Sequence, residues 1–86
     1  MFKNKATNGK NNICGQRVFE LRKSRCPKMS QRMLAEQLQL YGIDVDKNAV
    51  QRIESGQRFV TDIEIVALCA IFGISCDELL SDRKEQ

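Results

Sequence analysis

Four polar side chains share the outward face of a helix that we expect over residues 47–55. They are Lys47, Asn48, Gln51 and Arg52. Asparagine and glutamine can form two hydrogen bonds with adenine, and arginine and lysine with guanine, although the basic pair also suits phosphate groups. The major groove of B-DNA is about 12 Å wide and admits one helix. This face therefore has the chemistry to read base edges in double-stranded DNA, and a solvated helix face is the alternative.

Other chemistries are poorly represented in the 86 residues. The chain has no histidine, which excludes histidine acid–base catalysis and a Cys/His zinc site. No nucleophile stands beside a plausible base, and no glycine-rich phosphate loop is present. The four cysteines form no Cys-x-x-Cys pair, so we expect free thiols. We therefore expect a protein that is not an enzyme, with no catalytic residues, no metal and no cofactor.

Local start and stop signals divide the chain into five short helices. Serine, threonine and aspartate stand at helix starts, and glycine follows helix ends. The expected helices cover residues 15–24, 30–41, 47–55, 61–72 and 75–81. No segment alternates as a strand does, so the predicted fold class is all-α.

A set of motifs in a fixed order joins these elements. The motifs are Met29-Ser30-Gln31, Leu34-Ala35-Glu36, Val50-x-x-Ile53-Glu54-x-Gly56 and Phe72-Gly73-Ile74-Ser75-x-Asp77-Glu78-Leu79-Leu80. From Val18 to Leu80 the chain thereby resembles the phage-repressor-like helix-turn-helix family (Cro and lambda-repressor, Xre-type). The resemblance implies a five-helix lambda-repressor-like domain over residues 14–81. We expect a flexible basic arm at 1–13 and a short tail at 82–86.

The resemblance also implies roles around the helix at 47–55, which would be the recognition helix. The residues implied to contact phosphate are Gln31, Arg22, Gln57 and Arg58. Arg22 would pair with Glu54 and so orient a phosphate contact, but a surface ion pair worth about 0–1 kcal/mol is equally consistent with the residues. The interval from Leu34 to Glu54 is about five residues longer than the family's usual spacing. We expect either a longer second helix or a connection at 39–45 that bulges outward.

The helix expected at 61–72 is apolar on all sides. Its core stripe is predicted to comprise Ile65, Leu68, Cys69 and Phe72. The opposite face comprises Ile63, Val66, Ala67 and Ala70. A helix that is apolar all round is either enclosed or faces a partner. We expect this second face to form a homodimer interface, and a two-fold dimer would read DNA half-sites about 34–36 Å apart.

The charge distribution agrees with two different faces. Residues 1–58 hold 12 of the 14 basic residues and 5 of the 11 acidic ones, so the formal net charge of +3 hides a basic half and an acidic half. We therefore predict a sequence-specific DNA-binding transcriptional regulator, most simply a repressor. The alternatives are an antitoxin that pairs with a toxin and represses its own operon, and a protein-interaction module that binds an effector protein. With no apolar run that could span a membrane, we expect a cytoplasmic location.

Overall fold

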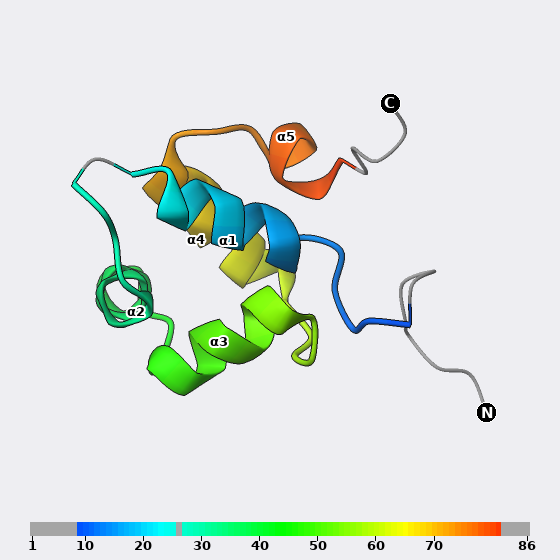
Figure 1. Ribbon diagram of the computed structural model, residues 1–86, viewed down its shortest axis with the longest axis horizontal. Helices are drawn as coiled ribbons and strands as arrows, with labels where there is room; N and C mark the ends of the chain where they lie inside the picture. Colours follow the sequence, from blue (N-terminus) through cyan, green and yellow to red (C-terminus); the bar gives the residue numbers. More distant parts are fainter. Residues whose placement is uncertain (1–8, 26, 82–86) are drawn as a thin grey trace.

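Five helices make up the computed structural model, which describes residues 9–25 and 27–81. They are α1 (Gly15–Lys23), α2 (Gln31–Leu40), α3 (Lys47–Ser55), α4 (Asp62–Phe72) and α5 (Cys76–Leu80). No strand occurs among the residues described. The all-α, five-helix prediction is therefore confirmed (Figure 1).

Each of the last four helices begins at a side chain that accepts a hydrogen bond from the backbone N–H three residues further on. These N-caps are Ser30, Asp46, Thr61 and Ser75. At Thr61 and Ser75 the glutamate three residues later also bonds back to the N-cap N–H, which completes a capping box. At the other end of α3, Gly56 has a left-handed φ of 86°, which favours glycine. Helix boundaries are thus set by neighbouring residues.

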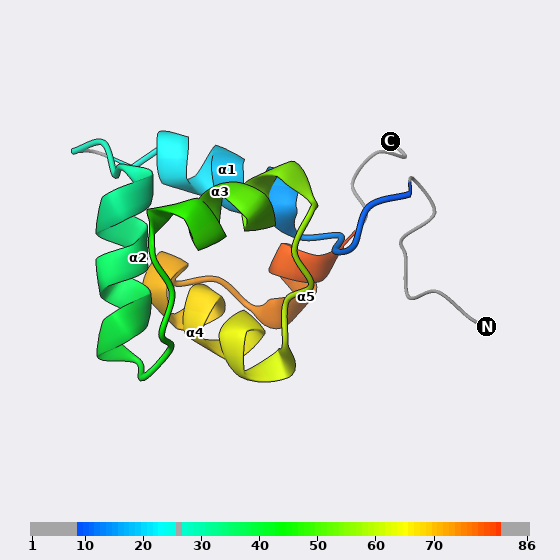
Figure 2. The ribbon, with the colours of Figure 1, turned by 90° about the horizontal axis from the view of Figure 1, so that it is seen from below.

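The five helices surround one apolar core. α3 packs against both α1 and α2, while α4 packs against α2 and α5. Seen from below, α3 crosses in front of α1, with α2 at one side (Figure 2). The core includes six residues of α2, α3 and α4 that are all buried: Leu34, Ala35, Val50, Ile53, Leu68 and Phe72. At Gly15 α1 lies so close to the Ile53 carbonyl that a β-carbon there would clash, so this glycine allows the two helices to meet.

The connection between α2 and α3 folds inward. Ile43 and Val45 are buried in the core, and the Gln39 side-chain amide donates to the Val45 carbonyl at 2.8 Å. Ile43 and Val45 therefore do not bulge outward, because apolar side chains gain from burial, whereas Leu40 and Tyr41 of the same stretch are exposed. Ile43 and Val45 instead pack against the core just before α3 begins.

The N-terminal arm divides at residue 9. Residues 1–8, like the tail at 82–86, lie outside the described residues. Residues 9–13 differ from the flexible arm that we expected, because Asn11 and Asn12 hydrogen-bond to the end of α3 and to the turn that follows it. No local pattern in the sequence indicated these hydrogen bonds, because the residues that accept them lie more than forty positions away.

α4 buries a wider arc than one stripe. Ala67, which we placed on the dimer face, is buried with only 3% of its surface exposed. The prediction for Ala67 is therefore wrong: α4 packs against both α2 and α5, and its buried arc is wider than the one stripe that we expected. Ile63 and Val66 remain 70% and 62% exposed, and Ala70 is also exposed. Ile65, expected in the core stripe, is only half-buried.

Candidate nucleic-acid interface

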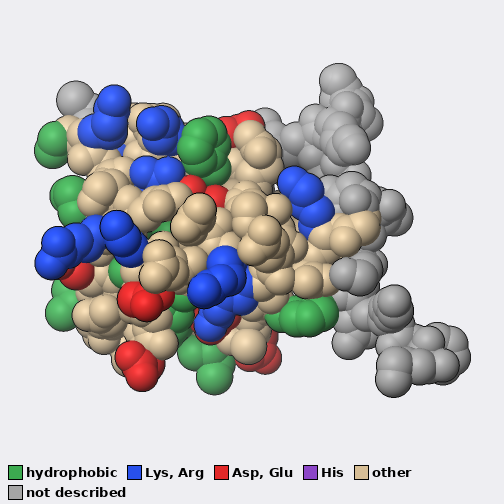
Figure 3. Space-filling view, turned by 60° about the horizontal axis from the view of Figure 1, so that its bottom comes forward, with side chains coloured by type: hydrophobic (Ala, Val, Ile, Leu, Met, Phe, Trp, Pro, Cys, Tyr) green, Lys and Arg blue, Asp and Glu red, His purple; other side chains and the backbone are tan. Residues whose placement is uncertain are grey.

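The two faces of α3 differ completely in exposure. Ala49, Val50 and Ile53 are buried against the core. The four side chains predicted to contact bases are all exposed: Lys47, Asn48, Gln51 and Arg52. Figure 3, in which the side of the molecule carrying α3 comes forward, shows several separate Lys and Arg side chains on this side, with other groups between them. The structure thus brings the predicted base-contacting residues together on one accessible helix face.

This face of α3 carries no carboxylate. The one acidic residue of the helix, Glu54, turns inward, and its side chain is 5% exposed. Asp46 precedes the helix, where its side chain accepts from the Ala49 N–H at 2.9 Å. The outward face therefore lacks a negative charge that would repel phosphate groups.

Glu54 is the centre of a polar network behind α3. It accepts two hydrogen bonds from the Arg22 guanidinium, at 2.6 and 2.9 Å, and a third from the Gln31 side-chain amide at 3.0 Å. The remaining guanidinium nitrogen, Nη1, donates to the Met29 carbonyl at 3.0 Å. All three nitrogens of Arg22 are thus occupied. The network joins α1, the start of α2 and α3, and so fixes the two helices of the helix-turn-helix relative to each other.

Burial changes the roles implied for two residues of this network. The Arg22 side chain is only 9% exposed, so the direct phosphate contact expected of it does not fit its position. A surface ion pair does not fit either, because both partners are buried. Gln31 is half-buried with its amide donating to Glu54, which leaves its backbone N–H at the α2 N-terminus as the group best suited to phosphate.

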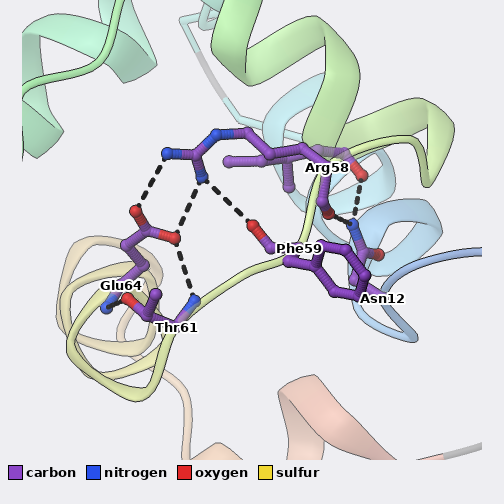
Figure 4. Close-up of polar contacts among 6 residues, drawn as sticks. Asn12, Arg58, Phe59, Thr61 and Glu64 are labelled. Atoms are coloured by element: carbon purple, nitrogen blue, oxygen red, sulfur yellow. Dashed lines mark hydrogen bonds and ion pairs between the residues drawn. The ribbon is translucent and has the colours of Figure 1, made fainter. Parts of the chain in front are cut away.

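The turn after α3 carries the other two residues predicted to contact phosphate. Gln57 is exposed, whereas Arg58 forms an ion pair with Glu64 through two hydrogen bonds of 3.0 and 3.1 Å (Figure 4). The Arg58 side chain is 30% exposed and that of Glu64 is 11% exposed. Burial disfavours the charged form of Glu64, but hydrogen bonds from Arg58 and from the Thr61 N–H outweigh it and lower the pKa of the carboxyl. A phosphate bound at Arg58 would have to share the guanidinium with this carboxylate.

Two asparagines that the sequence reasoning missed complete this end of α3. Asn12 donates to the Ile53 and Arg58 carbonyls, at 3.1 and 2.7 Å, and Asn11 donates to the Gln57 carbonyl at 2.8 Å. The Asn12 side chain also forms one local hydrogen bond, because its oxygen accepts from the Gly15 N–H three residues further on at 2.8 Å. The bonds to α3 had no signal in the sequence.

The cysteines follow the expectation of unpaired thiols where they are described. Cys14 and Cys69 are buried, Cys76 is exposed, and all three are free; Cys26 lies outside the described residues. Burial raises the pKa of Cys14 to about 11, so this thiol is inert at neutral pH. No cluster of three or more potential metal ligands occurs within residues 9–25 and 27–81.

Among residues 9–25 and 27–81, no helix has the length and apolar character that crossing a membrane requires.

Comparison with known proteins identifies the fold. A family model described as helix-turn-helix matches residues 20–79, from within α1 to within α5. No curated protein and no solved structure gives a significant match to the chain. The matched region includes the network around Glu54 and the whole of α3. The chain therefore belongs to the phage-repressor-like (Cro and lambda-repressor, Xre-type) helix-turn-helix family of DNA-binding domains.

Proposed function

We propose that this protein is a sequence-specific repressor of transcription that binds double-stranded DNA with α3 in the major groove. One observation carries the proposal: the four exposed polar side chains of α3 stand opposite its buried apolar face. Asn48 and Gln51 suit adenine, and Lys47 and Arg52 suit guanine. The repressor would act by occupying a promoter, without catalysis.

Contacts to phosphate set the register in which α3 meets the bases. The backbone N–H of Gln31 at the start of α2 and the exposed side chain of Gln57 after the end of α3 would make these contacts. Arg58 can add a charged contact, in exchange for part of its pairing with Glu64. Such contacts bind all sequences alike, and they orient the protein on the duplex.

A homodimer would extend the binding site. Its interface would include Ile63, Val66 and Ala70, because these exposed residues share one apolar face of α4 that a second copy would cover. A two-fold dimer predicts a symmetric DNA site with half-sites about 34–36 Å apart. Light scattering at tens of micromolar, with and without DNA, tests the dimer; a monomer in both conditions would contradict it.

Selection of bound sites from random DNA tests the whole proposal. We expect a symmetric consensus sequence. With that sequence as ligand, Arg52→Ala and Asn48→Ala should each weaken binding by about 1–3 kcal/mol and relax the preference at one base position. Gln57→Ala should weaken binding to every sequence by a similar factor, because it touches only phosphate.

The salt dependence of binding supplies the decisive control. Affinity that depends on phosphate contacts falls steeply as salt rises. If the wild-type protein showed no salt-dependent binding to any duplex, DNA binding would be excluded and the protein-interaction alternative favoured. If all three substitutions lowered affinity uniformly across sequences, the assignment of base contacts would be wrong.

A further inference from the structure

The N-terminal segment at residues 10–12 lies across the end of α3. A β-carbon at Gly56 would come within 2.9 Å of the Lys10 side chain, so this segment passes directly over the last turn of the helix. Asn11 and Asn12 follow, and we call these two residues together the asparagine clasp. The clasp lies outside residues 20–79, the part of the chain that the family model matches. It is therefore a feature of this chain beyond the matched domain.

The clasp holds three consecutive carbonyl groups. The Asn11 backbone N–H donates to Gly56 at 2.8 Å, and its side-chain amide donates to Gln57 at 2.8 Å. The Asn12 side-chain amide donates to Arg58 at 2.7 Å. Carbonyl groups at the end of a helix have no partner within the helix itself. Because each residue of the turn at 56–58 receives one bond, the backbone of this turn is fixed along its whole length.

Asn12 also ties the turn to two helices. Its amide nitrogen donates to the Ile53 carbonyl in α3 at 3.1 Å, and its side-chain oxygen accepts from the Gly15 N–H at the start of α1 at 2.8 Å. Figure 4 shows Asn12 on one side of Arg58, with Glu64 on the other side. The turn is therefore held between the asparagine clasp and the ion pair to α4.

We propose that Asn11 and Asn12 are positioning residues for DNA binding, and that they act by fixing the turn that presents Gln57 to phosphate. The inference rests on the proposed function, since it explains how the proposed contact between Gln57 and phosphate is held in place. A hydrogen bond to phosphate needs its donor in one place, and a free turn would lose conformational entropy on binding. The clasp, together with the hydrogen bonds from the Gln57 and Arg58 N–H groups to the Arg52 carbonyl, removes that cost before DNA arrives. The N-terminal segment thus belongs to the DNA interface, although the family match begins after it.

Asn11→Ala is the main test, because it removes the exposed hydrogen bond to the Gln57 carbonyl and leaves the backbone bond to Gly56. The probe is the duplex selected by the wild-type protein, with a scrambled duplex of equal length beside it. We expect the affinity for both duplexes to fall by a similar factor of about three to ten. Circular dichroism and titration of the active fraction, at a temperature where both proteins are folded, separate this loss from unfolding.

A double-mutant cycle distinguishes positioning from general stabilisation. If Asn11 acts through Gln57, then Gln57→Ala should cost little further affinity once Asn11→Ala is present. A residue that only stabilises the fold would give independent, additive losses. Additive losses, or an unchanged affinity in Asn11→Ala, would overturn the inference while leaving the proposed function intact. Failure of the wild-type protein to bind any duplex would instead overturn the proposed function.

Asn12→Asp separates the two functions of Asn12. A carboxylate still accepts from the Gly15 N–H but no longer donates to the Ile53 and Arg58 carbonyls. We expect weaker binding to both duplexes than in Gln16→Glu, a control that adds the same charge on the exposed first turn of α1 and leaves the clasp intact. Equal losses in Asn12→Asp and Gln16→Glu would show that the added charge alone is responsible, and would overturn the role of Asn12.

Discussion

Two arginine–glutamate pairs flank α3, and their surroundings give them different functions. Arg22–Glu54 lies behind the helix, with side chains 9% and 5% exposed. Arg58–Glu64 lies beyond its end, with side chains 30% and 11% exposed. Both arginines bind a carboxylate through two hydrogen bonds. Only Arg58 keeps enough exposure for DNA to reach it.

The difference shows how burial decides what a charged residue can do. A buried charge that loses its partner is costly, so Arg22 is bound to the fold and cannot exchange Glu54 for phosphate. A half-exposed guanidinium remains hydrated and can change partners at little cost. We therefore propose that Arg22 positions the helices, whereas Arg58 both stabilises the fold and binds DNA.

Removal of Arg22 should have the largest effect. Arg22→Met leaves the Glu54 carboxylate buried beside Gln31, and we expect the free energy of unfolding to fall by about 3–5 kcal/mol. Urea denaturation followed by circular dichroism measures this change. The double variant Arg22→Met, Glu54→Leu removes both charges and should be more stable than either single variant. A loss below about 1 kcal/mol in Arg22→Met would remove the distinction between the two pairs.

Arg58→Ala should cost less stability but should affect binding directly. We expect the free energy of unfolding to fall by about 1 kcal/mol, because the pair is partly exposed to solvent. Affinity for selected and scrambled duplexes should fall together. The slope of log affinity against log salt concentration should correspond to about one fewer ion released on binding. Fluorescence anisotropy at several salt concentrations measures both. An unchanged salt dependence would mean that Arg58 stabilises the fold and does not contact phosphate.

The response to acid should identify the contribution of Glu64. Its pKa is lowered in the folded protein, so its contribution to stability is complete above the pKa of the unfolded chain and is lost as the pH falls below 4.5 through the lowered value. We expect the urea midpoint to decrease over that range. Arg58→Ala should flatten the decrease, because it removes the main hydrogen-bond partner of the carboxylate. An equally steep decrease in Arg58→Ala would contradict this assignment.

A fully exposed pair supplies the smallest expected effect. Arg32 and Glu36 on α2 approach to 3.8 Å, with side chains 81% and 62% exposed. Glu36→Gln should change the free energy of unfolding by less than about 0.5 kcal/mol, since solvent and salt screen such pairs. The same urea experiment measures it. If Glu36→Gln lowered the free energy of unfolding as much as Arg58→Ala does, the exposure of an ion pair would not predict how much that pair stabilises the fold.

Much of the fold was predictable because helix ends depend on near neighbours. Ser30, Asp46, Thr61 and Ser75 cap helices through N–H groups three residues away, and each was recognised from its local sequence. The outward face of α3 followed from the helical repeat alone. Ala67 was placed wrongly because periodicity on a helix that is apolar all round does not show how wide the buried arc is.

The candidate site was predictable in its residue types and less so in their partners. Arg22 and Glu54 were expected to pair, through the resemblance, but their burial and the two further bonds of Arg22 and Gln31 were not. Asn11 and Asn12 were assigned to a flexible arm because Asn-rich segments without periodicity usually are flexible. Their partners were known only once the chain had folded.

The sequence by itself determined the five helices, their ends, the exposed polar face of α3 and the family. The helices, their ends and the polar face each depend on residues within a few positions of one another, where the spacing of the chain fixes which groups can meet. The family depends on the order of the motifs between Met29 and Leu80. The tertiary structure decided which charges are buried, and that the N-terminal segment is bonded to the turn after α3. Those outcomes join residues 32 to 46 positions apart, and the cost of closing such loops is met only when the whole core packs.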